Sequence, residues 1–304
     1  MKIAIGWYCC CLVMLVFLSK ELLAEGSNRG ADRDEIVAAL QRIQPPTFRD
    51  ASYSILDYEG CAAGNSANCA PAFARAVDHA AEQGGGRVVV PPGTFFVKGP
   101  IHLQSNVNLV LEEHAKIVFS ADPADYLPVV LTRFEGVEIW NYSPLIYARQ
   151  STNVAVTGRG TIDGQGSKGF QKFRRKQRRD QNLVRDMGNQ TIPLQQRVFG
   201  HGHYLRPSMI QFFNCSNVLV EGVTILDSTF WVIHPVYSRN VIVRGVTVDS
   251  VFINSDGTDP DSCRDVLIEN NTYNTGDDCI SIKSGRDADG WRVGIPSENI
   301  IVRN

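Results

Sequence analysis

Two stretches of the sequence decide the fold: CSNVLVEGVTILDS at residues 215–228 and SRNVIVRGVTVDS at residues 238–250. Both place Asn before Val-x-Val and then continue through Gly-Val-Thr. Variants of the same phrase occur at residues 104–113, 151–164, 263–275 and 297–304. In the last four phrases the Asn or Asp stands at positions 217, 240, 265 and 299, so the repeat advances by 23, 25 and 34 residues.

A repeat of about 20 residues that contains one such Asn or Asp is typical of a parallel β-helix. These residues tolerate the left-handed backbone of a corner, and the alternating apolar residues after them form a strand. We therefore predict an all-β solenoid in which Val218 and Val241 stack in successive layers. An antiparallel sandwich is the alternative, but it predicts hairpin turns such as Asn-Gly and gives no reason for a constant phrase.

Two helices are predicted ahead of the repeats. Ile36, Leu40 and Ile43 recur at helical spacing before two prolines, so residues 25–50 form a helical lead-in. Apolar residues again recur every four positions after Pro71. An open solenoid end exposes unpaired strand edges and apolar core, and we therefore expect this second helix to cap the N-terminal end.

The first 24 residues are typical of a signal peptide, because a positive charge and an apolar run precede a small residue at Ala24. A retained membrane anchor is the alternative, although the apolar run is short for a bilayer. We expect a secreted or periplasmic protein without stable membrane association. Residues 51–304 form the β-helix, which we expect to be incomplete at the C-terminus because Asn304 lies within a repeat phrase.

Composition excludes some functions. The net charge of −2 shows no basic excess, so we expect no nucleic-acid partner, and we expect a monomer. Of the 8 cysteines, five follow the predicted signal peptide, and we expect Cys61 to pair with Cys69. No Cys or His spacing indicates a zinc site.

Two acidic clusters lie one coil apart: NSDGTDPDSC at residues 254–263 and NTGDDCISIKSG at residues 274–285. The second lies in a run that otherwise predicts a buried strand. Asp256 and Asp277 are 21 residues apart, and we therefore place them on adjacent coils, roughly 4.8 Å apart directly and roughly 7 to 8 Å diagonally. Asp256, Asp277 and Asp278 are thus expected to converge.

Crowded carboxylates raise at least one pKa, so that one group stays protonated while another acts as a base. Cleavage of a glycosidic bond uses such a pair, and the diagonal spacing falls in the roughly 6.5 to 9.5 Å window that favours inversion. The alternative is structural, with Asp259 and Asp261 in Asx turns, or a calcium site. The cluster fits neither the EF-hand loop nor the nonapeptide repeat, and we expect no metal and no cofactor.

These motifs carry a family resemblance. NSDGTD, followed one coil later by GDDCISIKSG and preceded by PPGTFFVKG and GTIDGQG, resembles the polygalacturonase family of glycoside hydrolases from about Ser52 onward. The resemblance implies a right-handed, pectin-lyase-like parallel β-helix that hydrolyses α-1,4 bonds of galacturonan or a related pectic polysaccharide with inversion. It implies that Asp277 is the general acid and that Asp256 and Asp278 activate the attacking water.

The sequence departs from the family pattern in two places. Ser255 stands where the family has Thr or Asn, and neither Gly-His-Gly nor Arg-x-Lys follows Asp278. Gly-His-Gly does occur at residues 200–202, two coils too early, and we interpret it as a coincidence. Because galacturonate is an anion, the absent Arg-x-Lys pair puts substrate binding by this chain in question.

Other residues are candidates for substrate contact, each with a structural role as the alternative. They are Asn254, Lys283, Trp231 and His234. A basic run at residues 168–180 interrupts the repeats, either as an inserted loop or helix or as an electrostatic guide for a polyanion. Two other functions stay open: a calcium-dependent pectate lyase, and a non-catalytic β-helix that binds cell-wall polysaccharide.

Overall fold

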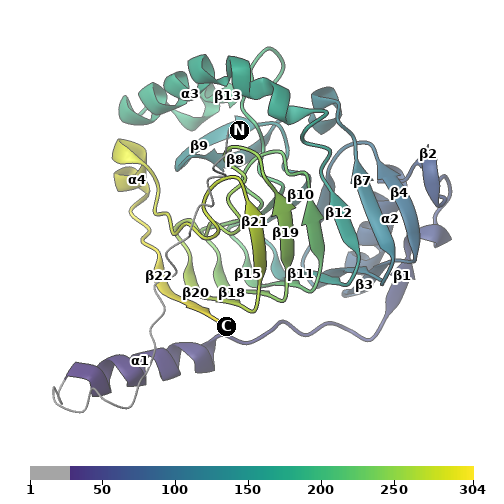
Figure 1. Cartoon of the computed structure of the whole chain (residues 1–304), viewed down its shortest axis with the longest axis horizontal. Coiled ribbons are helices and arrows are strands. Elements are labelled where there is room, and N and C mark those ends of the chain that lie inside the picture. Colours follow the sequence, from purple (N-terminus) through teal and green to yellow (C-terminus); the bar gives the residue numbers. More distant parts are fainter. Residues whose placement is uncertain (1–27) are drawn as a thin grey trace, which may run out of the picture.

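The computed structural model describes residues 28–304 and has the architecture of a parallel β-helix (Figure 1). Three parallel sheets of eight, seven and four strands run along the solenoid. Among the described strands, antiparallel pairing joins β8 to β9 alone. The predicted all-β parallel β-helix is therefore confirmed, and the antiparallel sandwich is wrong.

The strands of each sheet follow in spatial order. The first sheet contains β1 (Ser52–Ser54), β3 (Gly86–Val90), β6 (Val107–Leu111), β11 (Thr152–Gly158), β15 (Ser216–Glu221), β18 (Arg239–Arg244), β20 (Arg264–Glu269) and β22 (Glu298–Arg303). The second contains β2 (Gly64–Asn68), β4 (Gly93–Val97), β7 (Ala115–Phe119), β12 (Thr161–Asp163), β16 (Thr224–Leu226), β19 (Thr247–Ser250) and β21 (Thr272–Thr275). The third contains β17 (Ile233–Val236), β14 (Ile210–Phe213), β10 (Ile146–Arg149) and β5 (Ile101–Leu103). A small fourth sheet joins β13 (Val198–Phe199), β9 (Val137–Asn141) and β8 (Val130–Phe134).

The repeat phrase builds the first sheet in register. Val154, Val218, Val241 and Val266 pair across adjacent strands, and all four side chains are fully buried. The corner residue one position earlier has positive φ in each coil, at 57° for Asn217. Asn and Asp pay a smaller steric penalty there than other side chains, which explains why the phrase repeats them.

The corner side chains also bond to one another along the solenoid. Asn217 Nδ2 donates to Asn153 Oδ1 at 2.8 Å, and Asn240 Nδ2 donates to Asn217 Oδ1 at 2.9 Å. Asn299 Nδ2 donates to Asp265 Oδ1 at 3.0 Å. We call this row, at positions 106, 153, 217, 240, 265 and 299, the corner ladder. It satisfies polar groups that stacked corners would otherwise leave without partners.

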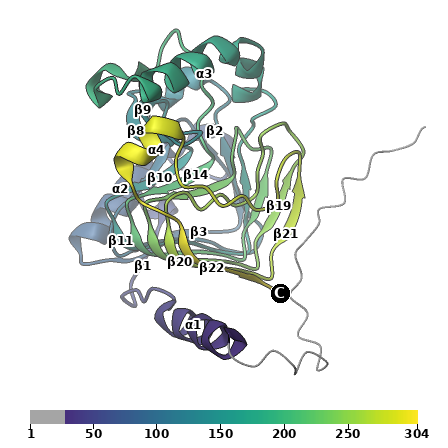
Figure 2. The ribbon, with the colours of Figure 1, turned by 90° about the vertical axis from the view of Figure 1, so that its left-hand side faces the viewer.

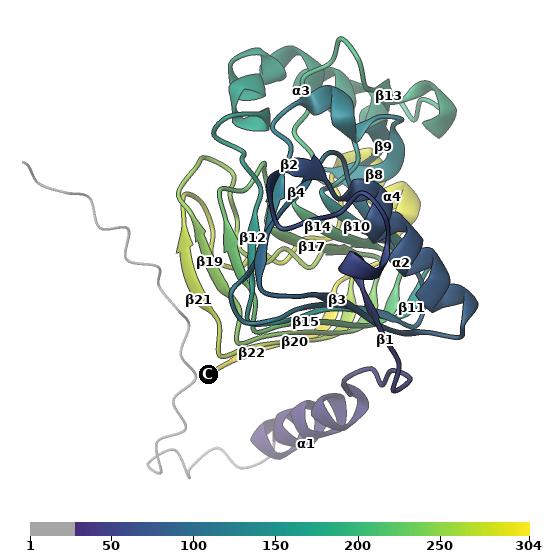
Figure 3. The same cartoon turned by 90° about the vertical axis from the view of Figure 1, so that its right-hand side faces the viewer.

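Helix α2 (Ala70–Glu82) covers the N-terminal end of the solenoid, as predicted (Figure 3). Pro71 stands in its first turn, where a missing N–H costs nothing. Phe73 and Val77 are buried against the core of the first coils. The predicted disulfide between Cys61 and Cys69 is present just before this helix.

Helix α1 (Asn28–Arg42) lies outside the solenoid against β20 and β22 (Figure 2). Ile43 follows it and packs on outward-facing residues of the first sheet, among them Leu219 and Ile242. The predicted signal peptide, residues 1–24, lies outside the described residues. Within residues 28–304, no helix has the length and apolarity needed to cross a bilayer.

Two inserted helices pack against the fourth sheet. Helix α3 (Arg174–Asn189) contains part of the basic run, and it contacts β9 and helix α4 (Asp287–Val293). Figure 1 shows this layer above the ends of the central strands. The long last step of the repeat, 34 residues, contains α4, which is too short to show helical periodicity in the sequence.

Candidate active site

The acidic segments extend the third sheet through isolated bridges. Thr258 bridges to Ile233 on one side and to Ile280 on the other. Asp256 and Asp278 each lie two residues before a bridging residue, and Gly257 N donates to Asp278 O at 2.9 Å. The register of the solenoid therefore places Asp278 beside Asp256 on the next coil.

Two glycines let these coils approach. A Cβ on Gly257 would lie 2.4 Å from the Tyr273 ring, and one on Gly276 would lie 2.2 Å from Phe252 O. Ser255 links the same two coils, because its hydroxyl oxygen accepts a hydrogen bond from Gly276 N at 3.1 Å. The serine that departs from the family pattern thus has a structural function here.

The three predicted carboxylates do converge. One oxygen each of Asp256, Asp277 and Asp278 lies within 4.8 Å of the others. The nearest oxygens thus approach as closely as the direct spacing of roughly 4.8 Å between adjacent coils, and more closely than the diagonal spacing of roughly 7 to 8 Å. The predicted strand around Asp277 is also wrong: Asp277 and Asp278 are exposed in a turn after β21, and the Ile282 side chain is 55% exposed.

Asp256 is the buried member of the group, with 3% of its surface exposed. Its Oδ1 has no hydrogen-bond partner among the described residues. Burial raises the pKa of Asp256 to about 6, the positive charge of Lys283 opposes this, and the negative charge of Asp277 adds to it. We predicted that like-charge crowding would raise a pKa in this group, but desolvation is the larger cause.

Asn254 orients Asp277. Its backbone N and its Nδ2 donate to Asp277 Oδ2 at 3.2 and 3.1 Å. Asn254 itself has a φ of 62° and accepts a 2.7 Å hydrogen bond from Arg206 Nη2. Asn254 thus has a definite structural role, and it also lines the pocket beside the carboxylates.

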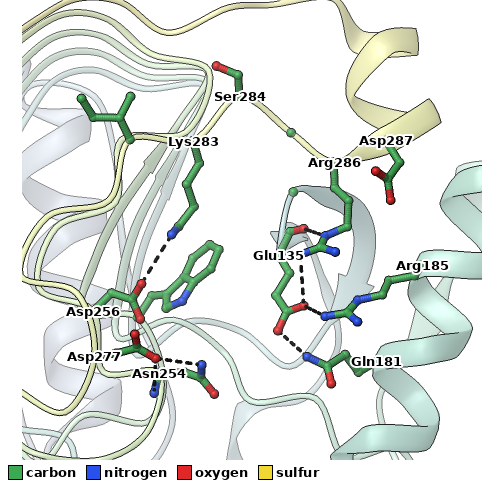
Figure 4. A pocket seen from close by; sticks show the side chains of 14 residues that line it. Glu135, Gln181, Arg185, Asn254, Asp256, Asp277, Lys283, Ser284, Arg286 and Asp287 are labelled. Carbon is green, nitrogen blue, oxygen red and sulfur yellow. Dashed lines mark hydrogen bonds and ion pairs between the residues drawn. The ribbon is translucent and has the colours of Figure 1, made fainter.

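Lys283 is the cation of the group (Figure 4). Its Nζ lies 3.0 Å from Asp259 Oδ1 and 3.4 Å from Asp256 Oδ2. Burial lowers its pKa, but attraction to Asp259 and Asp256 outweighs burial and raises it overall. Trp231 lies beneath, with its ring centroid 4.2 Å from Nζ. Both residues line the pocket, and Trp231 presents its face to the ammonium.

The prediction that His234 contacts a substrate is wrong. Its side chain is fully buried, and Nδ1 lies 3.0 Å from both Ser208 Oγ and Gln211 Nε2. Burial lowers the pKa of His234, although Asp261 opposes this effect. His234 Nε2 forms no hydrogen bond among the described residues and lies 3.6 Å from Asp261 Oδ2, so the ring belongs to the core beside that aspartate.

Asp259 and Asp261 form a buried second row behind the carboxylates. Burial, and then the charge of Asp256, raise the pKa of Asp259 well above its usual range. Asp261 pairs with the buried Arg133 at 2.9 Å. The sequence suggested turn residues here. Their alternation in Asp-Pro-Asp was the available signal, because residues at i and i+2 of an extended segment point the same way.

The opposite wall of the pocket was not predicted. It is built from Glu135 with Gln181, Arg185 and Arg286 (Figure 4). Arg185 Nη2 lies 2.8 Å from Glu135 Oε2, and Arg286 Nη2 lies 3.9 Å from the same oxygen. The pocket between the two walls has a volume of about 720 Å³. His201 of the early Gly-His-Gly is exposed and is not among the lining residues.

Three carboxylates this close can also ligate a hard cation, since calcium prefers oxygen ligands. Lys283 already supplies positive charge to Asp256 from 3.4 Å. The three carboxylates are therefore compatible with a metal ion, but Lys283 already compensates part of their negative charge.

Fold and site together define a parallel β-helix protein with a carboxylate cluster on one face of the solenoid. The model of glycosyl hydrolases family 28 matches residues 130–302. A probable polygalacturonase of Vitis vinifera is 30% identical over 97% of this chain and 56% of its own length. The chain belongs to family 28 of the glycosyl hydrolases.

Solved structures agree with this assignment. A hyperthermoactive exopolygalacturonase from Thermotoga maritima is 45% identical with a TM-score of 0.87, over 90% of this chain and 63% of that one. A polygalacturonase from Erwinia carotovora ssp. carotovora, at 18% identity and a TM-score of 0.60, shares the fold over 86% of this chain and 64% of that one. The chain thus spans less than two thirds of the length of these relatives.

Proposed function

We propose that the protein hydrolyses α-1,4 glycosidic bonds of galacturonan or a related pectic polysaccharide. The observation that carries this proposal is the convergence of Asp256, Asp277 and Asp278 within 4.8 Å at the edge of a pocket. Membership of glycosyl hydrolases family 28 supports it, as do relatives with polygalacturonase names.

The roles follow from environment. Asp277 donates a proton to the departing sugar oxygen, and Asn254 holds its carboxyl group in place. Asp256, with a pKa of about 6, accepts the proton of the attacking water, because a base works best when its pKa lies near the operating pH. Asp278 assists from the next coil. Water attacks the face opposite the departing oxygen, which inverts the anomeric centre.

The polymer is also the proposed partner in binding. Each galacturonate unit carries a carboxylate, and Lys283 with Arg286 places cations along the pocket. We further infer that residues 1–24 direct export, and that the mature protein acts outside the cytoplasm as a monomer without a cofactor. Sequencing the N-terminus of the exported protein would test the cleavage after Ala24, and sedimentation would test the monomer.

The experiment incubates the 304-residue chain with de-esterified polygalacturonate, with and without a chelator, and a longer chain as well wherever the gene encodes further residues. Hydrolysis predicts saturated reducing ends that persist with the chelator. Ultraviolet-absorbing unsaturated uronides that vanish with the chelator would instead establish the calcium-dependent lyase, which the carboxylate cluster also suits. Binding without any cleavage, by either chain, would support the non-catalytic alternative.

A further inference from the structure

Helix α3 turns one arginine-rich face toward the site. Arg174, Arg178, Gln181 and Arg185 are spaced by four, three and four residues, which places them on one side of the helix. All four line a groove of about 510 Å³, which Asn254 and Ile253 close on the other side. The basic run is therefore partly organised and not only a solvated insertion.

This groove continues into the active-site pocket. Gln181, Arg185 and Asn254 line both cavities. Asn254 is also the residue that holds Asp277 through two hydrogen bonds. A chain molecule that occupied the pocket could therefore extend along α3 without leaving the protein surface.

Arg206 adds a buried charge at the groove. Its side chain is fully buried, yet its hydrogen bonds go to neutral acceptors: Gln177 Oε1 at 2.8 Å, Gln171 Oε1 at 2.9 Å, Ile253 O at 3.0 Å and Asn254 Oδ1 at 2.7 Å. Among residues 28–304 no carboxylate forms an ion pair with it. Burial lowers the pKa of Arg206 to about 10, and the charge of Arg174 contributes.

Glu135 and Asp256 attract Arg206 without forming an ion pair with it. A buried cation without a directly paired carboxylate is costly, so its retention needs a compensating role. Arg174 and Arg178 are exposed and likewise form no ion pair with a carboxylate of the described chain. Arg185 is the exception, since Glu135 pairs with it. At Arg174 and Arg178 the groove thus carries positive charge that no carboxylate of the described residues pairs with, beside a cluster of negative charge.

We propose that this groove is a subsite for the carboxylate of a uronate sugar residue adjoining the one at Asp256 and Asp277, with Arg174 and Arg178 as its direct ligands. The proposal rests on the proposed function and adds a location and a ligand chemistry to it. Guanidinium groups suit it because they form paired, charge-assisted hydrogen bonds with carboxylates. Esterification of that carboxylate would remove the charge that the groove recognises.

The test measures binding, so that it does not depend on hydrolysis. The probes are de-esterified polygalacturonate and the same polymer after extensive methyl esterification, with the dissociation constant measured at fixed ionic strength. The variant is Arg174→Gln with Arg178→Gln. The matched control is Arg159→Gln with Arg239→Gln, which removes the same charge from exposed positions outside the groove.

We expect the groove variant to weaken binding of the charged polymer about tenfold or more, and binding of the esterified polymer less than about twofold. The control variant should change neither. Equal weakening by the groove variant and the control variant would mean that only the net charge of the protein affects binding, and would overturn the proposal. Unchanged binding in the groove variant would overturn it as well. If the parent chain binds selectively but never cleaves, the subsite stands and the hydrolase proposal fails.

Discussion

The corner ladder and the carboxylate site use the same coils in opposite ways. In the ladder, Asn217 both donates to and accepts from its neighbours, so its polar groups are satisfied by copies of itself. At the site, Asp256 Oδ1 and Asp259 Oδ2 are buried without a hydrogen bond among the described residues, and Asp259 Oδ1 has the ammonium of Lys283 at 3.0 Å. The ladder residues satisfy their own polar atoms, whereas the site holds buried polar atoms that lack hydrogen bonds.

The contrast between ladder and site shows how a solenoid supports chemistry. The regular coils are stable because residue choice, packing and hydrogen bonding there all favour the same fold. Residues that are unfavourable for the fold, such as buried polar groups without partners, concentrate at functional sites. The coil repeat supplies the register that brings Asp278 beside Asp256, while desolvation supplies the raised pKa of Asp256. Breaking the ladder should therefore cost stability, and breaking the site should cost activity.

The largest expected effect is on the site. Asp277→Asn, in a chain that cleaves the polymer, should lower kcat by about 10³-fold with little change in KM, because a proton donor in the transition state is lost. Steady-state kinetics on polygalacturonate would measure this. Asp186→Asn, at an exposed position on α3, is the control and should leave kcat unchanged. Retained turnover in Asp277→Asn would remove this residue from the role of the acid.

The next effect is on the ladder. Asn217→Ala should lower the free energy of unfolding by about 2 to 3 kcal/mol, because it removes two side-chain hydrogen bonds and leaves Cβ at a φ of 57°. Asn217→Gly removes the same bonds but tolerates the backbone, so its loss should be smaller by about 1 kcal/mol. Chemical denaturation would measure both, and equal losses would show that backbone strain is not part of the ladder's role.

A smaller effect should appear in the pH profile. Asp256 acts as a base only when ionised, so activity should rise with pH through its pKa of about 6. Lys283 lowers that pKa, and Lys283→Gln should therefore move the acid limb upward by about one pH unit. The control is Lys116→Gln, which removes the same charge from a pair with Asp163 on the second sheet. A limb that stays in place would mean that Asp256 does not set it.

The sequence predicts the regular part of the molecule well, because one physical requirement recurs there. The positive φ at Asn217 and Asn240 favours Asn over other residues, so these corners can be recognised in the sequence. The convergence of the three carboxylates then follows from the register of the coils. For His234 the sequence left a structural role and a substrate contact both open, because a polar residue in a strand carries no mark of which side it faces. Asp259 likewise lies in an irregular segment whose direction depends on bridges to the neighbouring coils.

The groove along α3 was predictable only as a charge run. An insertion has no repeat partner, so nothing in the sequence gives its place on the solenoid. The spacing of Arg174, Arg178 and Arg185 shows which side chains share a face of a helix, but not what that face meets. That information comes from packing of α3 against β9 and α4.

The smallest predicted effect tests the one acidic residue of the ladder. Asp265 Oδ1 accepts from Asn299 Nδ2 at 3.0 Å and pairs with Arg42, the last residue of α1, also at 3.0 Å. Asp265→Asn keeps the corner conformation and an acceptor for Asn299, and loses two ion pairs, with Arg42 and with Arg264 at 3.7 Å, whose arginine side chains are 50% and 55% exposed. Solvent screening makes such pairs weak, so the free energy of unfolding should change by less than about 1 kcal/mol, and Arg42→Gln should match it. A loss as large as that of Asn217→Ala would mean that α1 stabilises the solenoid through this charge, and that the ladder's stability is not set by corner geometry alone.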